Sequence, residues 1–130
     1  MAKTLAELLE AAHAVVPGIS TEDAQAKMAE GALLLDIRDA PELLKTGRAH
    51  GSHHIPRGML EFRAQEGTPT YDPELRKDRV IILHCAAGGR AAMAGKVLKE
   101  MGYEHVYNLG GFKNWVEAGG PTDEPADSGM

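Results

Sequence analysis

The chain has 130 residues, a length that suits one domain with a substantial core and is short for two. Hydrophobic residues make up 43% and charged residues 25%, the balance of an ordinary globular protein. The formal net charge of -5 argues against a nucleic-acid partner, because nucleic-acid-binding proteins usually carry a basic face.

Helices and short apolar runs alternate along the chain. Polar residues that cap helices mark three starts, at Thr4, Ser20 and Asp39. In chain order we expect helices over 4–16, 20–31, 39–47, 58–65, 90–101 and 112–118, and strands over 32–36, 52–55, 80–83 and 103–109. The alternation predicts an α/β fold with a central, mostly parallel sheet of about five strands and helices on both faces.

We expect a single domain over residues 1–120, in which residues 1–18 form an N-terminal helical extension. The acidic, proline-bearing tail 121–130 is expected to be disordered. No apolar run is long enough to span a bilayer, so we expect no membrane partner. A single cysteine excludes an internal disulfide and thus the framework of a small secreted protein. A reducing cytoplasm is the expected location, and it suits a free thiol.

That cysteine, Cys85, follows the clearest strand and precedes a short loop that leads into a helix. Ligands of parallel sheets bind at the carboxyl ends of strands. Free N–H groups at a helix start provide positive potential, which a thiolate needs, and two glycines let the loop turn tightly. A lone cysteine is more often a small buried hydrophobe, but such a residue requires no Gly-Gly-Arg loop. The pattern therefore predicts a cradle for a thiolate or another anion.

The spacing within this loop bears on what it holds. Four residues separate Cys85 from Arg90, and Ala91 follows the arginine. The loop of cysteine-based phosphatases is one residue longer and continues with Ser or Thr. The shorter ring suits a small group held close to sulfur better than a tetrahedral phosphate.

Four segments in order resemble the rhodanese (thiosulfate sulfurtransferase) superfamily in its single-domain form. They are an Asp-x-Arg-x-x-x-Glu segment, a Gly-rich segment that ends in Ile-Pro, a six-residue active-site loop and a Gly-Gly-x-x-x-Trp segment, at 35–42, 47–56, 85–90 and 110–121. The resemblance covers roughly residues 19–121 and implies a rhodanese-like fold that needs no cofactor.

The resemblance also implies a persulfide mechanism with Cys85 as the nucleophile. The Cys85 thiolate attacks the sulfane sulfur of a small donor such as thiosulfate, and a thiophilic acceptor, cyanide or a cellular thiol, then removes that sulfur. With no second cysteine, the acceptor must come from outside the chain, and a sulfur-accepting protein remains an option. The candidate substrate-binding residues are Ala86, Ala87, Gly88, Gly89, Arg90 and Arg38.

The sequence leaves open the roles of several other polar residues near these segments. Asp36 is expected to be structural, Glu42 to be a helix N3 carboxylate, and Arg90 to brace the loop as well as bind an anion. No metal site is expected, because adjacent strand residues such as His53 and His54 point to opposite faces. The sequence does not assign roles to His50, His53, His54 and His84, or to Arg57 and Arg63 at a pocket mouth.

Two other functions compete with sulfur transfer. One is a phosphatase or arsenate reductase on the same scaffold, against which the short loop argues. The other is a non-catalytic rhodanese-like binding module, although such relatives usually lose the cysteine that is present here. Neither the physiological donor and acceptor nor the oligomeric state is encoded in a motif.

Overall fold

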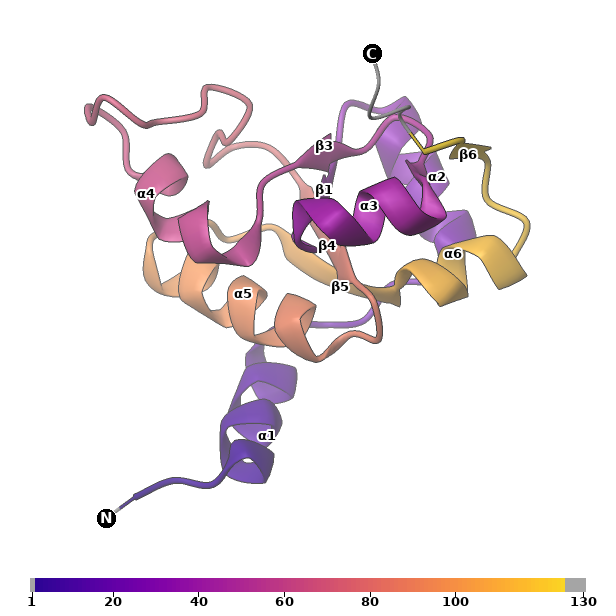
Figure 1. The fold of residues 1–130 in the computed structure, drawn as a ribbon. Coiled ribbons are helices and arrows are strands. Elements are labelled where there is room, and N and C mark those ends of the chain that lie inside the picture. Colours follow the sequence, from indigo (N-terminus) through magenta and orange to yellow (C-terminus); the bar gives the residue numbers. More distant parts are fainter. Residues whose placement is uncertain (1, 126–130) are drawn as a thin grey trace.

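A four-stranded parallel sheet lies at the centre of the computed structural model, which describes residues 2–125 (Figure 1). The strand order is β3-β1-β4-β5, with β1 at Leu33–Asp36, β3 at His53–His54, β4 at Ile81–Cys85 and β5 at Val106–Gly111. All three pairings are parallel, so the carboxyl ends of the strands meet at one edge. The predicted α/β class is confirmed, with four strands in the main sheet.

Helices cover both faces of this sheet (Figure 1). They are α1 (Leu5–Val15), α2 (Thr21–Ala29), α3 (Ala40–Thr46), α4 (Leu60–Ala64), α5 (Gly89–Glu100) and α6 (Phe112–Glu117), with a short 3-10 helix η1 at Arg57–Met59. Alternate residues of a strand point to opposite faces, and two buried apolar clusters result. Leu35 and Leu83 pack with α4 and α5, whereas Leu34 and Ile82 pack with α2 and α6.

The central strand β4 is buried along its whole length, as expected of a parallel strand covered on both faces. It extends two residues beyond the predicted end at Leu83, because the ladder to β5 continues with His84 opposite Gly110 and Cys85 opposite Gly111. A register shift between Leu83 and His84 accommodates this extension. Cys85 is therefore the last residue of the strand, held in place by the sheet itself.

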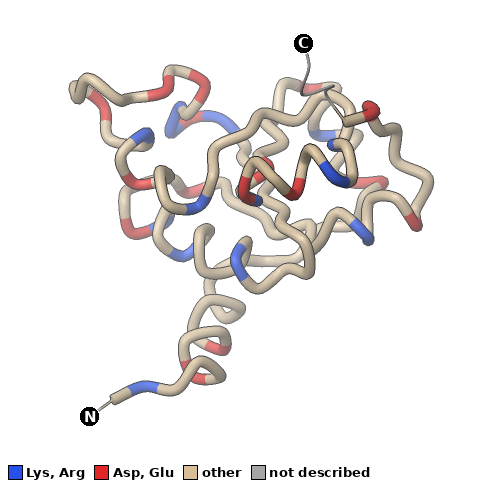
Figure 2. Tube along the Cα trace, viewed as in Figure 1, with Lys and Arg blue, Asp and Glu red and all other residues tan. Residues whose placement is uncertain are grey.

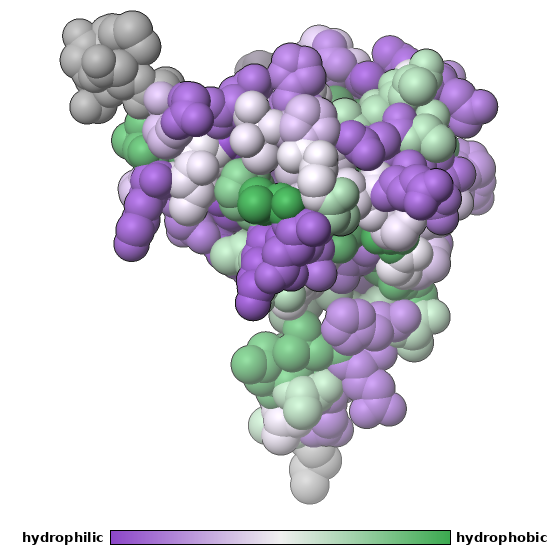
Figure 3. Space-filling model, turned by 90° about the vertical axis from the view of Figure 1, so that its right-hand side faces the viewer, coloured by the Kyte–Doolittle hydropathy of each residue, from purple (hydrophilic) through white to green (hydrophobic). Residues whose placement is uncertain are grey.

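The N-terminal helix α1 projects from the body of the molecule (Figure 1). Its last turn packs on α5, where Val16 lies over Gly95, and the capping box at Thr4 closes its free end. Leu5, Leu8 and Val15 are exposed, and Figure 3 shows hydrophobic side chains on the projecting helix. Among residues 2–125, no helix combines the length and apolarity needed to cross a bilayer.

The prediction of a disordered tail is wrong for residues 121–125. Strand β6 (Thr122–Asp123) pairs antiparallel with β2 (Arg48–Ala49), and Trp115 Nε1 donates to the carbonyl of Pro121 at 2.6 Å. These contacts are made largely by the backbone, so an acidic, proline-bearing composition gave no sign of them. The rest of the predicted tail, 126–130, lies outside the described residues.

Candidate active site

The sulfur of Cys85 lies at the carboxyl edge of the sheet, where the chain turns from β4 into α5. The residue is 1% exposed, and its Sγ accepts a hydrogen bond from the Gly88 N–H at an N–S distance of 2.9 Å. The predicted cradle thus has one observed donor. The contribution of the N–H groups of Ala86, Ala87, Gly89 and Arg90 to anion binding stays a prediction.

Two glycines make this turn possible. Gly88 has φ of +108°, in the left-handed region that side chains rarely adopt, and an added Cβ would lie 3.3 Å from Gly110 Cα. At Gly111 a Cβ would lie 2.0 Å from the carbonyl oxygen of Ala86, so the end of β5 touches the loop. Asn108 on β5 completes the support, because its Nδ2 donates to the carbonyl of Gly88 at 3.3 Å. Sequence reasoning missed Asn108, which no motif marked.

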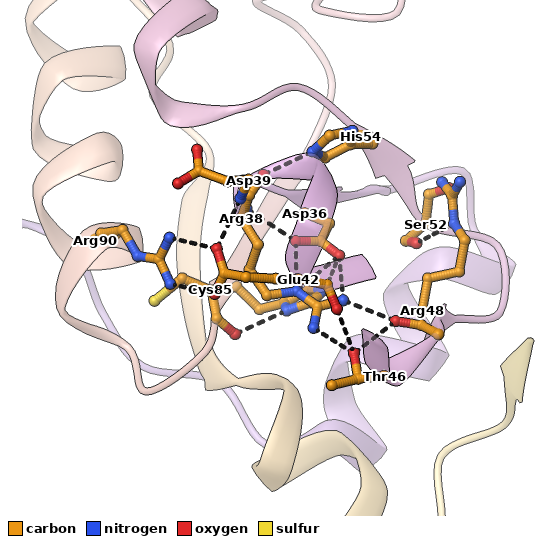
Figure 4. Close-up of polar contacts among 12 residues, drawn as sticks. Asp36, Arg38, Asp39, Glu42, Thr46, Arg48, Ser52, His54, Cys85 and Arg90 are labelled. Atoms are coloured by element: carbon orange, nitrogen blue, oxygen red, sulfur yellow. Dashed lines mark hydrogen bonds and ion pairs between the residues drawn. The ribbon is translucent and has the colours of Figure 1, made fainter. Parts of the chain in front are cut away.

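Arg90 is held by a bidentate ion pair with Glu42 (Figure 4). Both N–O distances are 2.8 Å, and both side chains are half-buried. Glu42 also accepts from the Asp39 N–H at 2.8 Å, the predicted N3 contact of α3. The hydrogen bonds from Arg90 hold the pKa of Glu42 at about 2, and Glu42 in turn raises the pKa of Arg90. The bracing role predicted for Arg90 is confirmed; its contact with a bound anion stays a prediction.

Arg38 is buried and engaged by other groups of the protein. Its side chain is 2% exposed and donates to both carboxylate oxygens of Asp36, to Thr46 Oγ1 and to the carbonyl of Gly47. Asp36 is buried at the end of β1 and requires a counter-ion. Burial opposes its ionisation, but hydrogen bonds from Arg38, together with the charge of Arg38 and the nearby His84, outweigh that effect and lower the pKa of Asp36. Arg38 therefore ties β1 to the end of α3, and a part for it in substrate binding stays a prediction.

His84 is fully buried beside the reactive residue but faces the other side of the sheet. Its Nδ1 lies 3.2 Å from the Cys85 carbonyl oxygen, and its Nε2 lies 3.6 Å from Asp36 Oδ2 without a hydrogen-bond partner. Desolvation lowers the pKa of His84, which favours the neutral ring. Because adjacent strand residues point in opposite directions, this ring is not placed for proton transfer with the Cys85 sulfur.

The other histidines of the predicted group each have a different partner. His50 Nδ1 lies 3.0 Å from Asp123, His53 Nε2 lies 2.6 Å from Asp72, and His54 Nε2 lies 2.6 Å from the Arg38 carbonyl oxygen. Within residues 2–125, no three His, Cys, Asp or Glu side chains gather in a way that could hold a metal ion.

The two arginines around α4 also have acidic neighbours. The Arg57 N–H donates to the Ile37 carbonyl, which places Arg57 at the carboxyl edge of the sheet, and its guanidinium pairs with Glu61 at 2.7 Å. The positive charge of Arg63 acts on Asp72, on the side of the long loop between α4 and β4. Of the two, Arg57 lies at the edge that carries Cys85.

Comparison with known proteins agrees with this geometry. The rhodanese-like domain family matches residues 20–118. The chain is 36% identical to the thiosulfate sulfurtransferase GlpE of Actinobacillus succinogenes over 96 residues, which cover 72% of this chain and 78% of that one. It is 30% identical to a sulfurtransferase of Allochromatium vinosum over 114 residues, covering 85% and 98% of the two chains.

A similar solved structure is that of a protein of unknown function from Rhodopseudomonas palustris, described as a possible tyrosine phosphatase. It superposes with a TM-score of 0.85 at 33% identity and covers 95% of this chain and 96% of its own. Since the family match spans most of the chain, and Cys85, its loop and the Glu42–Arg90 pair lie within it, this protein belongs to the rhodanese-like domain family.

Proposed function

We propose that the protein transfers sulfane sulfur through a persulfide on Cys85. The observation that carries the proposal is the Cys85 sulfur at the end of β4, which accepts the Gly88 N–H within a tight loop at the start of α5. An N–H aimed at sulfur stabilises negative charge on it, and the start of a twelve-residue helix adds favourable potential. The sulfurtransferase relatives support the same chemistry.

The reaction has two nucleophilic steps. The Cys85 thiolate attacks the outer sulfur of a donor such as thiosulfate; a bond to Sγ forms, the donor's sulfur–sulfur bond breaks, and sulfite leaves with the electron pair. A thiophilic acceptor, a cellular thiol or cyanide, then attacks the outer sulfur of the persulfide, and the Cys85 thiolate is the leaving group. In this mechanism the Gly88 N–H, which donates to Sγ, stabilises the thiolate at the start and at the end.

The acceptor is external, because Cys85 is the only cysteine of the chain. A sulfur-accepting protein could take this role as well as a small thiol, since Ala86 and Ala87 of the loop are exposed. A reducing compartment such as the cytoplasm would keep Cys85 reduced and supply thiol acceptors.

Intact-mass measurement tests the proposal on a single residue. After incubation with thiosulfate, the protein should gain the mass of one sulfur atom, and addition of cyanide should remove it with release of thiocyanate. The Cys85→Ser variant is the control and should gain nothing. Absence of the added sulfur in the wild-type protein, or its presence in Cys85→Ser, would contradict the mechanism.

A phosphatase or arsenate reductase is the second candidate, favoured by the description of the R. palustris structure. The four-residue spacing to Arg90 and the engagement of that arginine by Glu42 argue against it. Hydrolysis of an aryl phosphate, or reduction of arsenate, faster than sulfur transfer would reverse this ranking. A binding module without activity would instead hold its partner equally well in Cys85→Ser and form no persulfide.

A further inference from the structure

Several positive charges at the carboxyl edge of the sheet are paired with carboxylates of the protein itself. Three guanidinium groups at this edge are each paired with a carboxylate: Arg38 with Asp36 at 2.8 Å, Arg57 with Glu61 at 2.7 Å, and Arg90 with Glu42 at 2.8 Å. A paired guanidinium already donates its best-placed N–H groups to the carboxylate, so an incoming anion must compete with that carboxylate for the guanidinium.

The balance of positive and negative charge is least favourable to a bound anion next to the Cys85 sulfur. Arg90 acts electrostatically on Cys85, and both Glu42 and Asp39 act on Arg90. Figure 4 shows Arg90 and Glu42 beside Cys85, with Asp39 nearby at the start of α3. Figure 2 shows acidic and basic residues interspersed along the described part of the chain, and the net charge of the full sequence is -5. The guanidinium of Arg90 is thus paired with Glu42, and Asp39 adds a second negative charge at the start of α3, so the three side chains together are negative even before the thiolate charge is counted.

Possible donors differ in the charge that they bring to this group. Thiosulfate is a dianion, so its reaction with the Cys85 thiolate gathers three negative charges, which end on the persulfide anion and sulfite. A protonated alkyl persulfide, R–S–SH, is neutral at the reacting sulfurs. There the thiolate bonds to the outer sulfur, the S–S bond breaks, RS⁻ leaves, and the single negative charge is conserved.

We propose that the physiological donor is a persulfide or polysulfide of low charge, and that Asp39 and Glu42 select against dianionic donors such as thiosulfate. This inference rests on the proposed Cys85 persulfide and specifies its source. The backbone N–H of Gly88 stabilises one sulfur anion, and the paired arginines provide little further positive potential for a second anionic group.

Two persulfide donors that differ by one charge, placed away from the reacting sulfurs, distinguish an effect of donor charge from an effect of chemical reactivity. The donors are 2-hydroxyethyl persulfide and 2-sulfonatoethyl persulfide, each generated fresh, and the readout is the rate at which Cys85 gains one sulfur by intact mass. Each rate is divided by the rate of the same donor with a peptide of residues 80–90. We expect the sulfonate donor to be slower by about threefold to tenfold, as for one charge acting across several ångströms of partly solvated site.

Conservative variants then test the two carboxylates. Asp39→Asn keeps a good helix N-cap and Glu42→Gln keeps an N3 side chain that can accept from the Asp39 N–H, so both remove charge without removing the cap. Each should raise the rates with thiosulfate and the sulfonate donor about threefold or more, and Asp39→Asn should change the hydroxyethyl rate less than about twofold. Glu100→Gln, about 16 Å away at the other end of α5, is the matched control and should alter none of them.

Salt provides an independent readout. Raising the ionic strength from about 0.02 M to about 0.5 M should speed loading from thiosulfate, because screening weakens the repulsion, and should leave the hydroxyethyl donor nearly unaffected. Equal normalised rates for the two persulfides, or a thiosulfate rate that falls with salt, would overturn the inference while leaving the Cys85 persulfide intact. Failure of every donor to load Cys85 would instead overturn the proposed function.

Discussion

Adjacent glycines of the active-site loop should respond in opposite ways to the same substitution. At Gly88 an alanine would have to adopt φ of +108°, and its Cβ would lie 3.3 Å from Gly110 Cα. Left-handed backbone costs an L-residue about 1–2 kcal/mol, and the tight contact adds to this, so Gly88→Ala should lower the free energy of unfolding by about 1–3 kcal/mol. The Gly88 N–H would also shift from Sγ, so persulfide formation should slow by about tenfold or more, toward the roughly hundredfold that complete loss of such a donor costs.

At Gly89 the same methyl group meets ordinary space. The nearest atom to its Cβ would be Leu9 Cδ2 at 3.7 Å. Gly89 is the first residue of α5, and its φ is not positive. Gly89→Ala should therefore stabilise the protein by about 0.4–1 kcal/mol, because alanine restricts the unfolded chain and favours a helix. Urea unfolding and the rate of persulfide formation measure both variants. If Gly88→Ala matches the wild type in stability and rate, the assignment of this N–H to the sulfur is wrong.

Three further substitutions test the contacts that hold the site. Arg38→Met should destabilise the fold by about 3–5 kcal/mol in urea unfolding, because it leaves the Asp36 carboxylate buried and unpaired; an unchanged midpoint would contradict the structural role. Since hydrogen bonds from Arg90 lower the pKa of Glu42 to about 2, this pair contributes stability above the unfolded pKa of about 4.3 and loses it as pH falls through about 2. Glu42→Gln should flatten that part of the acid-unfolding curve, and identical curves would refute the pairing. Trp115→Phe removes one hydrogen bond to the chain after α6, so faster hydrogen exchange at Thr122 is expected, with no change in persulfide formation.

Local sequence patterns predicted the sheet and its helices because each strand or helix is marked by residues within or next to it. The apolar run of β4 and the caps of α3 depend on residues close in sequence, and the structure places both where expected. The predicted position of Cys85 at the carboxyl edge followed from the same reasoning. Its inclusion in the strand did not, because that depends on pairing with Gly111 of β5.

Partners distant in sequence could not be predicted in this way. Glu42 and Arg90 are separated by 48 positions, and no rule of spacing joins them. A guanidinium that follows a strand, such as that of Arg38, can either face the site or neutralise a buried carboxylate, and the sequence does not distinguish these two directions. The structure shows the second, since Asp36 lies in the core with no other cation in hydrogen-bond contact among the described residues.

The electrostatics of the site depend more on backbone than on side-chain charge. A net charge of -5 means that positive potential for the sulfur must be made locally. The guanidinium of Arg90 is held by Glu42, which also caps α3, so this ion pair joins the loop to the start of α3. What remains for the sulfur is the Gly88 N–H and the start of α5, both fixed by the sheet through β4 and β5. In the proposed mechanism such a site stabilises one sulfur anion at a time, which is what the transfer of a single sulfur atom from donor to acceptor requires.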